Sequence, residues 1–228
     1  MKTIKKMQRI SAIGRKGIAM SSFKWAIMIA MCVLCTGHAF GQFKIKVGAT
    51  AGFNFAALVE EDELSDLRTG FRGGAIADFG LHKNFSIAPE LLFSQRGWKY
   101  IGKDEDEGIT QTAKLNYVEM PINLVVKFKV ASDVKLILFP GFYVGYAFSA
   151  KLKHVEKGEG TKTGKIPLGK GMEEFNPLDM GMNLGIGIEV KSVFFRFQLH
   201  PGFKNVSNDP DYSSTNSAVS LSLGYFFN

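Results

Sequence analysis

The amino-acid sequence predicts an all-β fold: an eight-stranded antiparallel up-and-down barrel with a polar lumen. Three observations lead to this prediction. Eight stretches after residue 41 alternate apolar and polar side chains, long and short connections alternate between them, and the last stretch ends in an aromatic pair. Successive side chains of a strand point to opposite faces of a sheet, so each stretch has one apolar and one polar face.

The first three stretches run over residues 43–55, 71–81 and 85–98. One face of each is rich in Phe, Ile, Leu and Ala, and the other carries charged or small side chains. That second face comprises Lys44, Lys46, Thr50, Asn54, Arg72, Gly74, Asp78, Gly80, Ser86, Glu90, Ser94 and Arg96. The short link 82–84 fits a turn between antiparallel neighbours.

The other five stretches run over residues 114–129, 134–149, 178–190, 193–200 and 219–228. Their apolar faces contain Val, Ile, Leu, Met, Phe and Tyr, and their polar faces contain Glu119, Arg196 and several glycines. Short links at 131–133 and 191–192 join neighbouring stretches. The terminal stretch closes on Phe226 and Phe227, which resembles the C-terminal signature of bacterial outer-membrane proteins, displaced by one residue.

The connections predict that this barrel spans an outer membrane. Long, polar and charged segments alternate with the short links, and they cover residues 59–69, 102–110, 150–176 and 205–216. Long extracellular loops and short periplasmic turns are typical of outer-membrane barrels. An even number of strands lets the sheet close without an exposed edge, as a bilayer requires.

The alternation alone does not tell which face lies inside, so an exported soluble ligand-binding β-barrel with an apolar interior is an alternative. Aromatic-rich apolar faces favour contact with lipid. The glycines on the polar faces favour a crowded lumen, because eight strands enclose room only for side chains.

Residues 1–41 are predicted to be a signal peptide, and residues 42–228 the outer-membrane barrel domain. The first segment carries seven basic residues and no acid, then an apolar run from Trp25 to Cys35 and a small-x-small site at 39–41. The run is too short for a spanning helix. Met20 is an alternative start, because Met20 to Gly41 forms a compact leader.

The basic charge of the chain belongs to this leader. The chain has 28 Lys and Arg against 21 Asp and Glu, and seven of the basic residues precede residue 42. The predicted mature part is therefore balanced, which excludes a nucleic-acid footprint. Both cysteines, Cys32 and Cys35, also lie in the leader, so the mature chain has no disulfide or Cys-based metal site.

Four motifs resemble the PorT-like outer-membrane β-barrel family of Bacteroidetes. They lie at Gly48–Asn54, Tyr117–Leu124, Pro140–Tyr146 and Asp179–Glu189, whereas Leu199–Phe203 departs from the family pattern. The resemblance implies an eight-stranded barrel. One family member takes part in protein secretion and gliding, but most have no assigned role, so that activity does not transfer.

No catalytic constellation is present, and the chain is not predicted to be an enzyme. Nucleophile-elbow, P-loop and dinucleotide fingerprints are missing. The mature histidines, His82, His154 and His200, stand apart, so neither a metal nor a cofactor is predicted. The acidic run 104–107 either binds a divalent ion or forms a solvated loop tip, and its spacing favours the latter.

The most informative signal is a set of charged residues at the strand positions whose side chains point into the lumen: Arg72, Glu90, Glu119 and Arg196. Buried charges must be paired, so we expect a lumen charge network that plugs the barrel and contains both Glu119 and Arg196. The resulting hypothesis is a structural or protein-interaction barrel linked to secretion or the cell surface. A narrow channel or transport barrel is the alternative.

The predicted partners follow from the membrane location. They are outer-membrane lipids and lipopolysaccharide, the barrel-assembly machinery during insertion, and an unidentified envelope protein, with no nucleic acid. The lysines of the longest connection either contact anionic lipopolysaccharide or belong to a mobile charged loop, and both interpretations are open. These lysines are Lys151, Lys153, Lys157, Lys162, Lys165 and Lys170.

We predict that the mature protein starts near Gln42 and resides in the outer membrane, because the leader ends in a small-x-small site. Membrane fractionation followed by N-terminal sequencing checks this. A soluble periplasmic protein, or an inner-membrane form that keeps its leader, would contradict it.

Overall fold

The computed structural model describes residues 44–60, 63–102, 108–158, 160–171, 174–208 and 213–227. Within these ranges it has twelve strand segments: β1 (Lys44–Glu60), β2 (Glu63–Leu64), β3 (Arg68–His82), β4 (Phe85–Arg96), β5 (Lys99–Ile101), β6 (Ile109–Lys129), β7 (Val134–Leu138), β8 (Gly141–Glu156), β9 (Gly160–Lys165), β10 (Leu178–Val190), β11 (Val193–Pro201) and β12 (Ser214–Phe226). The predicted leader and the acidic run 104–107 lie outside the described residues. The described ranges contain no helix long and apolar enough to cross a membrane, a finding that does not bear on strands.

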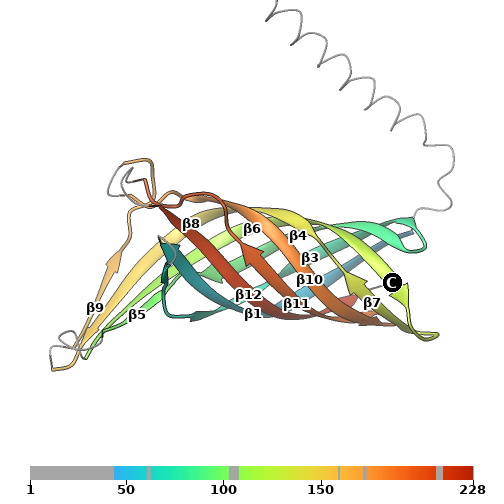
Figure 1. Ribbon diagram of the computed structural model, residues 1–228, viewed down its shortest axis with the longest axis horizontal. Helices are drawn as coiled ribbons and strands as arrows, with labels where there is room; N and C mark the ends of the chain where they lie inside the picture. Colours follow the sequence, from blue (N-terminus) through green and yellow to red (C-terminus); the bar gives the residue numbers. More distant parts are fainter. Residues whose placement is uncertain are drawn as a thin grey trace, which may run out of the picture. The chain divides into compact units, whose positions relative to one another are not determined.

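The strands close into an antiparallel ring (Figure 1). Each of β1, β3, β4 and β6 pairs with the next, β6 pairs with both β7 and β8, and β10, β11 and β12 complete the circle. Thirteen paired positions, from Gly48↔Phe226 to Glu60↔Ser214, join β12 to β1. The predicted eight-stranded up-and-down barrel is confirmed, with β7 and β8 together serving as one ring strand.

The predicted continuous strand 134–149 is broken at Phe139 and Pro140. Proline has no N–H to donate, so it interrupts a ladder hydrogen bond. The sheet remains closed there, because Phe139 donates its N–H to Gly185 at 3.0 Å and the Pro140 carbonyl accepts from Leu124 at 2.9 Å.

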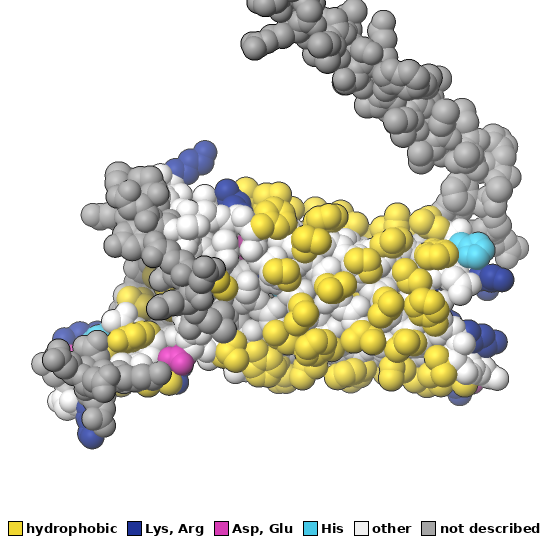
Figure 2. Space-filling view, in the orientation of Figure 1, with side chains coloured by type: hydrophobic (Ala, Val, Ile, Leu, Met, Phe, Trp, Pro, Cys, Tyr) yellow, Lys and Arg dark blue, Asp and Glu magenta, His cyan; other side chains and the backbone are white. Residues whose placement is uncertain are grey.

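The barrel wall is apolar outside, and most of its inward side chains are polar or charged. Large apolar side chains of the ring strands are exposed, including Phe53, Leu91, Met120 and Leu184. Figure 2 shows them as a broad apolar band over the visible wall, with Lys and Arg side chains at the end where the short turns lie. This arrangement matches lipid outside and excludes the alternative of a soluble barrel with an apolar interior.

The long connections contain more strand than the sequence predicted. The segment 150–176, predicted to be a loop, continues β8 to Glu156 and returns as β9, and β12 begins at Ser214 rather than near residue 219. β5, β9 and the outer parts of β6 and β8 form a wing that extends beyond the ring (Figure 1). The outer part of β8 reads Lys-Leu-Lys-His-Val-Glu and β9 reads Gly-Thr-Lys-Thr-Gly-Lys, patterns too polar to distinguish an exposed hairpin from a loop.

Glycines in the lumen make room for aromatic rings. A Cβ atom at Gly224 would lie 2.0 Å from Phe194 Cζ, and one at Gly185 would lie 2.1 Å from Phe139 Cε2. Phe194 and Phe139 belong to an inward apolar layer that consists of Ile76, Ala88, Val125, Ile137, Phe139, Phe194 and Phe226. These contacts with phenylalanine rings explain why glycine, which has no Cβ atom, fits the crowded interior that the sequence predicted.

We predict that Leu124→Arg or Leu184→Arg costs about 2–4 kcal/mol of barrel stability, the cost of a cation near the bilayer midplane. Both leucines lie midway along outward faces, with 44% and 58% of their surface exposed. Ser222→Ala, on the lumen face, is the control and should be nearly silent. Unfolding after refolding into lipid vesicles reads out the difference, and equal tolerance on both faces would contradict the orientation.

Candidate functional site

The centre of the lumen holds an ion pair between β4 and β6. Arg96 Nη2 donates to Glu119 Oε2 at 2.7 Å, and both side chains are 1% exposed. Arg72, from β3, approaches the other oxygen of Glu119 at 3.7 Å. The three residues share the inward parity of adjacent strands, so a single carboxylate lies between two guanidinium groups.

Arg96 also organises the side of the network toward β8 and β10. Its Nη1 donates to Tyr143 Oη at 2.9 Å and lies 3.5 Å from Asp179 Oδ2, and its guanidinium stacks 4.3 Å from the Tyr143 ring centroid. Asn216 donates to Asp179 at 3.4 Å and to Tyr117 Oη at 3.0 Å. Arg96 is therefore held by two carboxylates, a phenol oxygen and an aromatic face.

A second ion pair joins β4 to β11. Arg196 Nη1 donates to Glu90 Oε1 at 2.7 Å, and Asn123 Nδ2 donates to the same oxygen at 3.0 Å. The Arg196 guanidinium lies 4.3 Å from the Phe194 ring centroid and 5.0 Å from that of Phe139. This pair forms the boundary between the polar network and the inward apolar layer.

Hydrogen bonds connect the two ion pairs through His200. From the Glu90 side, Asn183 donates to Asn123 at 3.1 Å, and His200 Nδ1 lies 2.7 Å from Asn183 Oδ1. On the other side of the ring, Arg72 Nη1 donates to His200 Nε2 at 2.8 Å. Nδ1 must therefore carry the hydrogen and Nε2 the lone pair, which makes the imidazole neutral.

Apolar layers flank this network along the barrel. Toward the short turns lies the inward apolar layer, and beyond it Lys127 pairs with Asp78, while Glu189 accepts from Lys46 and Lys135 at 2.8 and 2.9 Å. Toward the wing lies a second cluster of Ala113, Leu115, Tyr117, Ala147 and Ala150, against which Trp98, Leu152, Ile166, Leu168 and Phe175 pack. The network is thus enclosed at both ends.

The structure places Arg72, Glu90, Glu119 and Arg196 in the lumen, each with at most 4% of its surface exposed. They lie in one connected set of contacts, in which Glu119 and Arg196 do not touch each other directly. Glu119 contacts Arg96 and Arg72, whereas Arg196 contacts Glu90.

Sequence reasoning missed Arg96, Asp179 and His200 as members of the network. The signal was available for Arg96 and Asp179, because both lie at polar positions of their strands and Arg96 is six residues, or three periods of the alternation, beyond Glu90. Selecting every inward charge would have found Arg96 and Asp179. The neutral His200 bridge depends on contacts between distant strands and has no signal in its own segment.

Nothing in the described part of the chain suggests a metal centre, because no three His, Cys, Asp or Glu side chains there are grouped to hold an ion. The carboxylates of the central network, Glu90, Glu119 and Asp179, are engaged by guanidinium groups. In this arrangement three buried guanidinium groups and three buried carboxylates compensate each other's charge. The guanidinium groups belong to Arg72, Arg96 and Arg196, and the carboxylates to Glu90, Glu119 and Asp179.

We predict that the coupling free energy of unfolding is larger between two residues that form a direct ion pair than between charged residues taken from different pairs. Glu119→Gln or Arg96→Met alone should cost about 3–5 kcal/mol, because each leaves a buried charge unpaired, and the double variant should cost less than the sum. Urea unfolding in detergent measures the cycle.

The control cycle uses Glu119→Gln with Arg196→Met, which share no direct contact. Its coupling energy should be smaller by about 1 kcal/mol or more. A crossed coupling as large as the Glu119–Arg96 coupling would contradict the arrangement of pairs described here.

Comparison with solved structures finds small outer-membrane barrels. The attachment invasion locus protein Ail of Yersinia pestis is 11% identical, with a TM-score of 0.42, over 80% of this chain and 98% of that protein. Neisserial surface protein A is 12% identical, with a TM-score of 0.45, over 82% and 100% of the two chains. The outer membrane protease OmpT of Escherichia coli is 10% identical, with a TM-score of 0.34, over 83% and 99%.

A comparison with curated proteins finds no match. The sequence does match one family, described as "outer membrane protein beta-barrel domain", over residues 40–208. That match covers all ring strands except β12 and most of the 228 residues. Together with the closed ring and its apolar outer wall, it places the protein in the outer membrane, and the chain belongs to the outer membrane protein beta-barrel domain family.

Proposed function

We propose that this protein is a non-conducting outer-membrane barrel with a structural or protein-interaction role. The observation that carries the proposal is the lumen charge network, in which three buried guanidinium groups oppose three buried carboxylates. A conducting pore needs a continuous column of water. Here ion pairs and aromatic rings occupy the lumen, and an eight-stranded barrel has little further room.

The enclosed position of the network supports a plug rather than a selectivity filter. Charged rings that select ions line open passages, where ions enter and leave. In this lumen the charges lie between two apolar clusters, one of which includes Phe139, Phe194 and Phe226. A narrow channel, the alternative function, would need both clusters to open.

An interaction role would then use the surface, and the wing end is the best candidate. The long connections gather there, and long connections of outer-membrane barrels face the outside. The wing carries its own apolar cluster around Leu115 and Trp98, so it is a packed support rather than a bare loop. We infer that a cell-surface or envelope partner binds at this end, after the barrel-assembly machinery has inserted the chain.

We further infer that residues 1–41 are removed as a signal peptide and that the chain belongs to the PorT-like branch from Bacteroidetes. Support for the branch comes from its four motifs, which fall on ring strands β1, β6, β8 and β10. Glu119, within the Tyr117–Leu124 motif, is the carboxylate at the centre of the network. Membership of this branch does not by itself assign a secretion role to this chain.

We predict that the purified protein adds no steady conductance steps to planar lipid bilayers, because its lumen is filled and charge-neutral. Single-channel recording checks this, with a general porin as the positive control in the same bilayers. Insertion is verified separately by protease protection of the reconstituted barrel. Reproducible steps from protein shown to be folded would overturn the plug and restore the channel alternative.

A further inference from the structure

The outer surface of the wing continues the lipid-facing wall. Along β6, outward positions run without interruption from Met120 and Val118 through Asn116 to Lys114. Along β8, Phe148 is the last large outward apolar side chain before Lys151, and it is 53% exposed. β8 has one extra residue here relative to β6, because Asn116 pairs with Ser149 and Tyr117 pairs with Ala147. This bulge leaves both Phe148 and Lys151 on the outward face, and at about 3.3 Å per residue Lys151 lies roughly 7 Å further along the ladder than Phe148. Lys151 is therefore the first outward charge beyond the apolar wall on β8.

Lysines line up on this outward surface. The register pairs Lys114 with Lys151 and Lys151 with Lys165, so three lysines stand in one cross-strand row, which we call the lysine row. Lys153 and Lys99 occupy the next level, each opposite Thr112. In the part of the chain that the structure describes, the lysine row forms no ion pair with a carboxylate.

Like charges placed directly opposite each other destabilise a sheet. Lysine on an edge strand also prevents unwanted pairing, which accounts for Lys165 on β9. It does not account for Lys114 and Lys151, because β6 and β8 are paired on both sides. An anion on the outward surface would offset the repulsion at all three positions.

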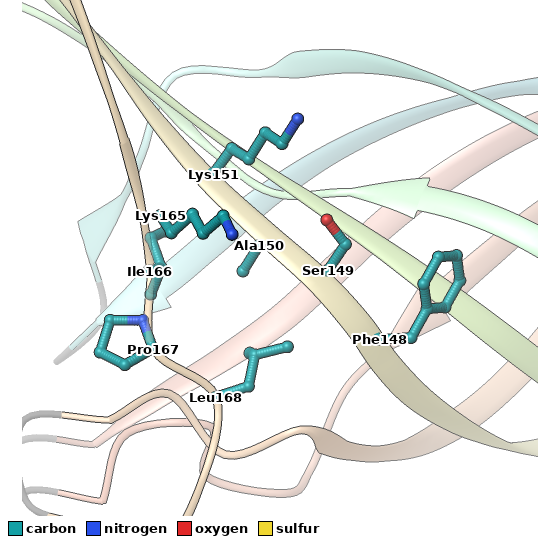
Figure 3. Close-up of a pocket in the computed structure, with 8 residues that line it drawn as sticks. All are labelled: Phe148, Ser149, Ala150, Lys151, Lys165, Ile166, Pro167 and Leu168. Carbon is teal, nitrogen blue, oxygen red and sulfur yellow. The ribbon is translucent and has the colours of Figure 1, made fainter.

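A crevice opens beside the lysine row (Figure 3). β8 pairs with β10 only up to Tyr146 and with β9 only from Lys151, so the two neighbours separate around the intervening residues. The crevice has a volume of about 480 Å³ and is lined by Phe148, Ser149, Ala150, Lys151, Lys165, Ile166, Pro167 and Leu168. In Figure 3 residues 165–168 form one side of it and residues 148–151 of β8 form the other, with Lys151 and Lys165 toward the top of the view and Pro167 and Leu168 toward the bottom.

We propose that the lysine row and this crevice bind a phosphorylated glycolipid of the outer leaflet, the lipid anchor of lipopolysaccharide. Its phosphate would accept charge-assisted hydrogen bonds from Lys151 and Lys165. An acyl chain would lie against Phe148 and continue down the apolar wall. The site is amphipathic in the same sense as the ligand, with cations at headgroup height and apolar side chains toward the membrane. It does not depend on whether the lumen is closed.

The structure also separates the lysines of this region into two groups. Lys151, Lys153 and Lys165 face outward, and Lys114 and Lys99 join them from neighbouring strands. Lys162 lies on the opposite face, paired with His154, and Lys157 and Lys170 lie in the connections that follow β8 and β9. Lys157 and Lys170 therefore provide a charge-matched control.

The test titrates lipid A carrying its phosphates into the full-length mature protein in dodecylmaltoside and counts bound lipid by native mass spectrometry. A lysine near an anionic lipid surface is worth about fivefold in affinity, so K151Q/K165Q should bind about thirtyfold more weakly. K157Q/K170Q removes the same charge and should change affinity by less than about threefold. Phosphatase-treated lipid A should bind the wild-type protein as weakly as intact lipid A binds K151Q/K165Q.

Four results would overturn the proposal. Unchanged binding by K151Q/K165Q would remove the lysine row from the site, and an equal loss in K157Q/K170Q would reduce the effect to net charge. Phosphatidylglycerol that binds as tightly, with the same dependence on Lys151 and Lys165, would refute the glycolipid as the specific ligand. If the wild-type protein binds no lipid A, the glycolipid proposal is wrong and an acidic protein segment becomes the candidate ligand of the lysine row. Heat-modifiability on gels confirms that each variant is folded before it is compared.

Discussion

Backbone hydrogen bonding in lipid is the constraint on which this structure depends. A strand inside a bilayer has no water to satisfy its N–H and C=O groups, so every one must pair within the sheet. The thirteen paired positions between β1 and β12 meet this demand by leaving the ring no edge. The same demand explains the break at Pro140, where neighbouring main-chain groups keep the wall closed although the proline cannot donate.

Closure of the ring determines what the lumen can contain. Alternation sends every second side chain inward, and eight strands leave those side chains no central space for bulk water. A charge that enters this region needs a partner, because burial of an unpaired ion is costly. The pairs Arg96–Glu119 and Arg196–Glu90 are therefore consequences of the barrel size. The apolar part of the lumen is equally crowded, because the glycines that contact Phe139 and Phe194 leave no room for a Cβ atom.

The sequence predicted faces far better than partners. Parity alone assigns Arg72, Glu119 and Arg196 to the lumen, because the period of a strand is fixed by backbone geometry. Which carboxylate meets which guanidinium depends on the stagger between strands and on their tilt. Neither quantity is local, which is why a direct contact of Glu119 with Arg96 could not be inferred. The wing was missed for another reason, since its polar strands lack an apolar face long enough to stand out.

Because the lumen is filled, any binding function must use the outer surface of the barrel. Most of that surface is a uniform apolar wall, which lipid covers without selectivity. The wing is the exception, because there the ring gives way to a sheet with an apolar inner face and a basic outer face. The cross-strand alignment of Lys114, Lys151 and Lys165 lowers the stability of the isolated sheet. The natural place for such a row is against an anionic layer, and in an outer-membrane protein with outward-facing long connections that layer begins beyond Phe148, at the level of the lysine row.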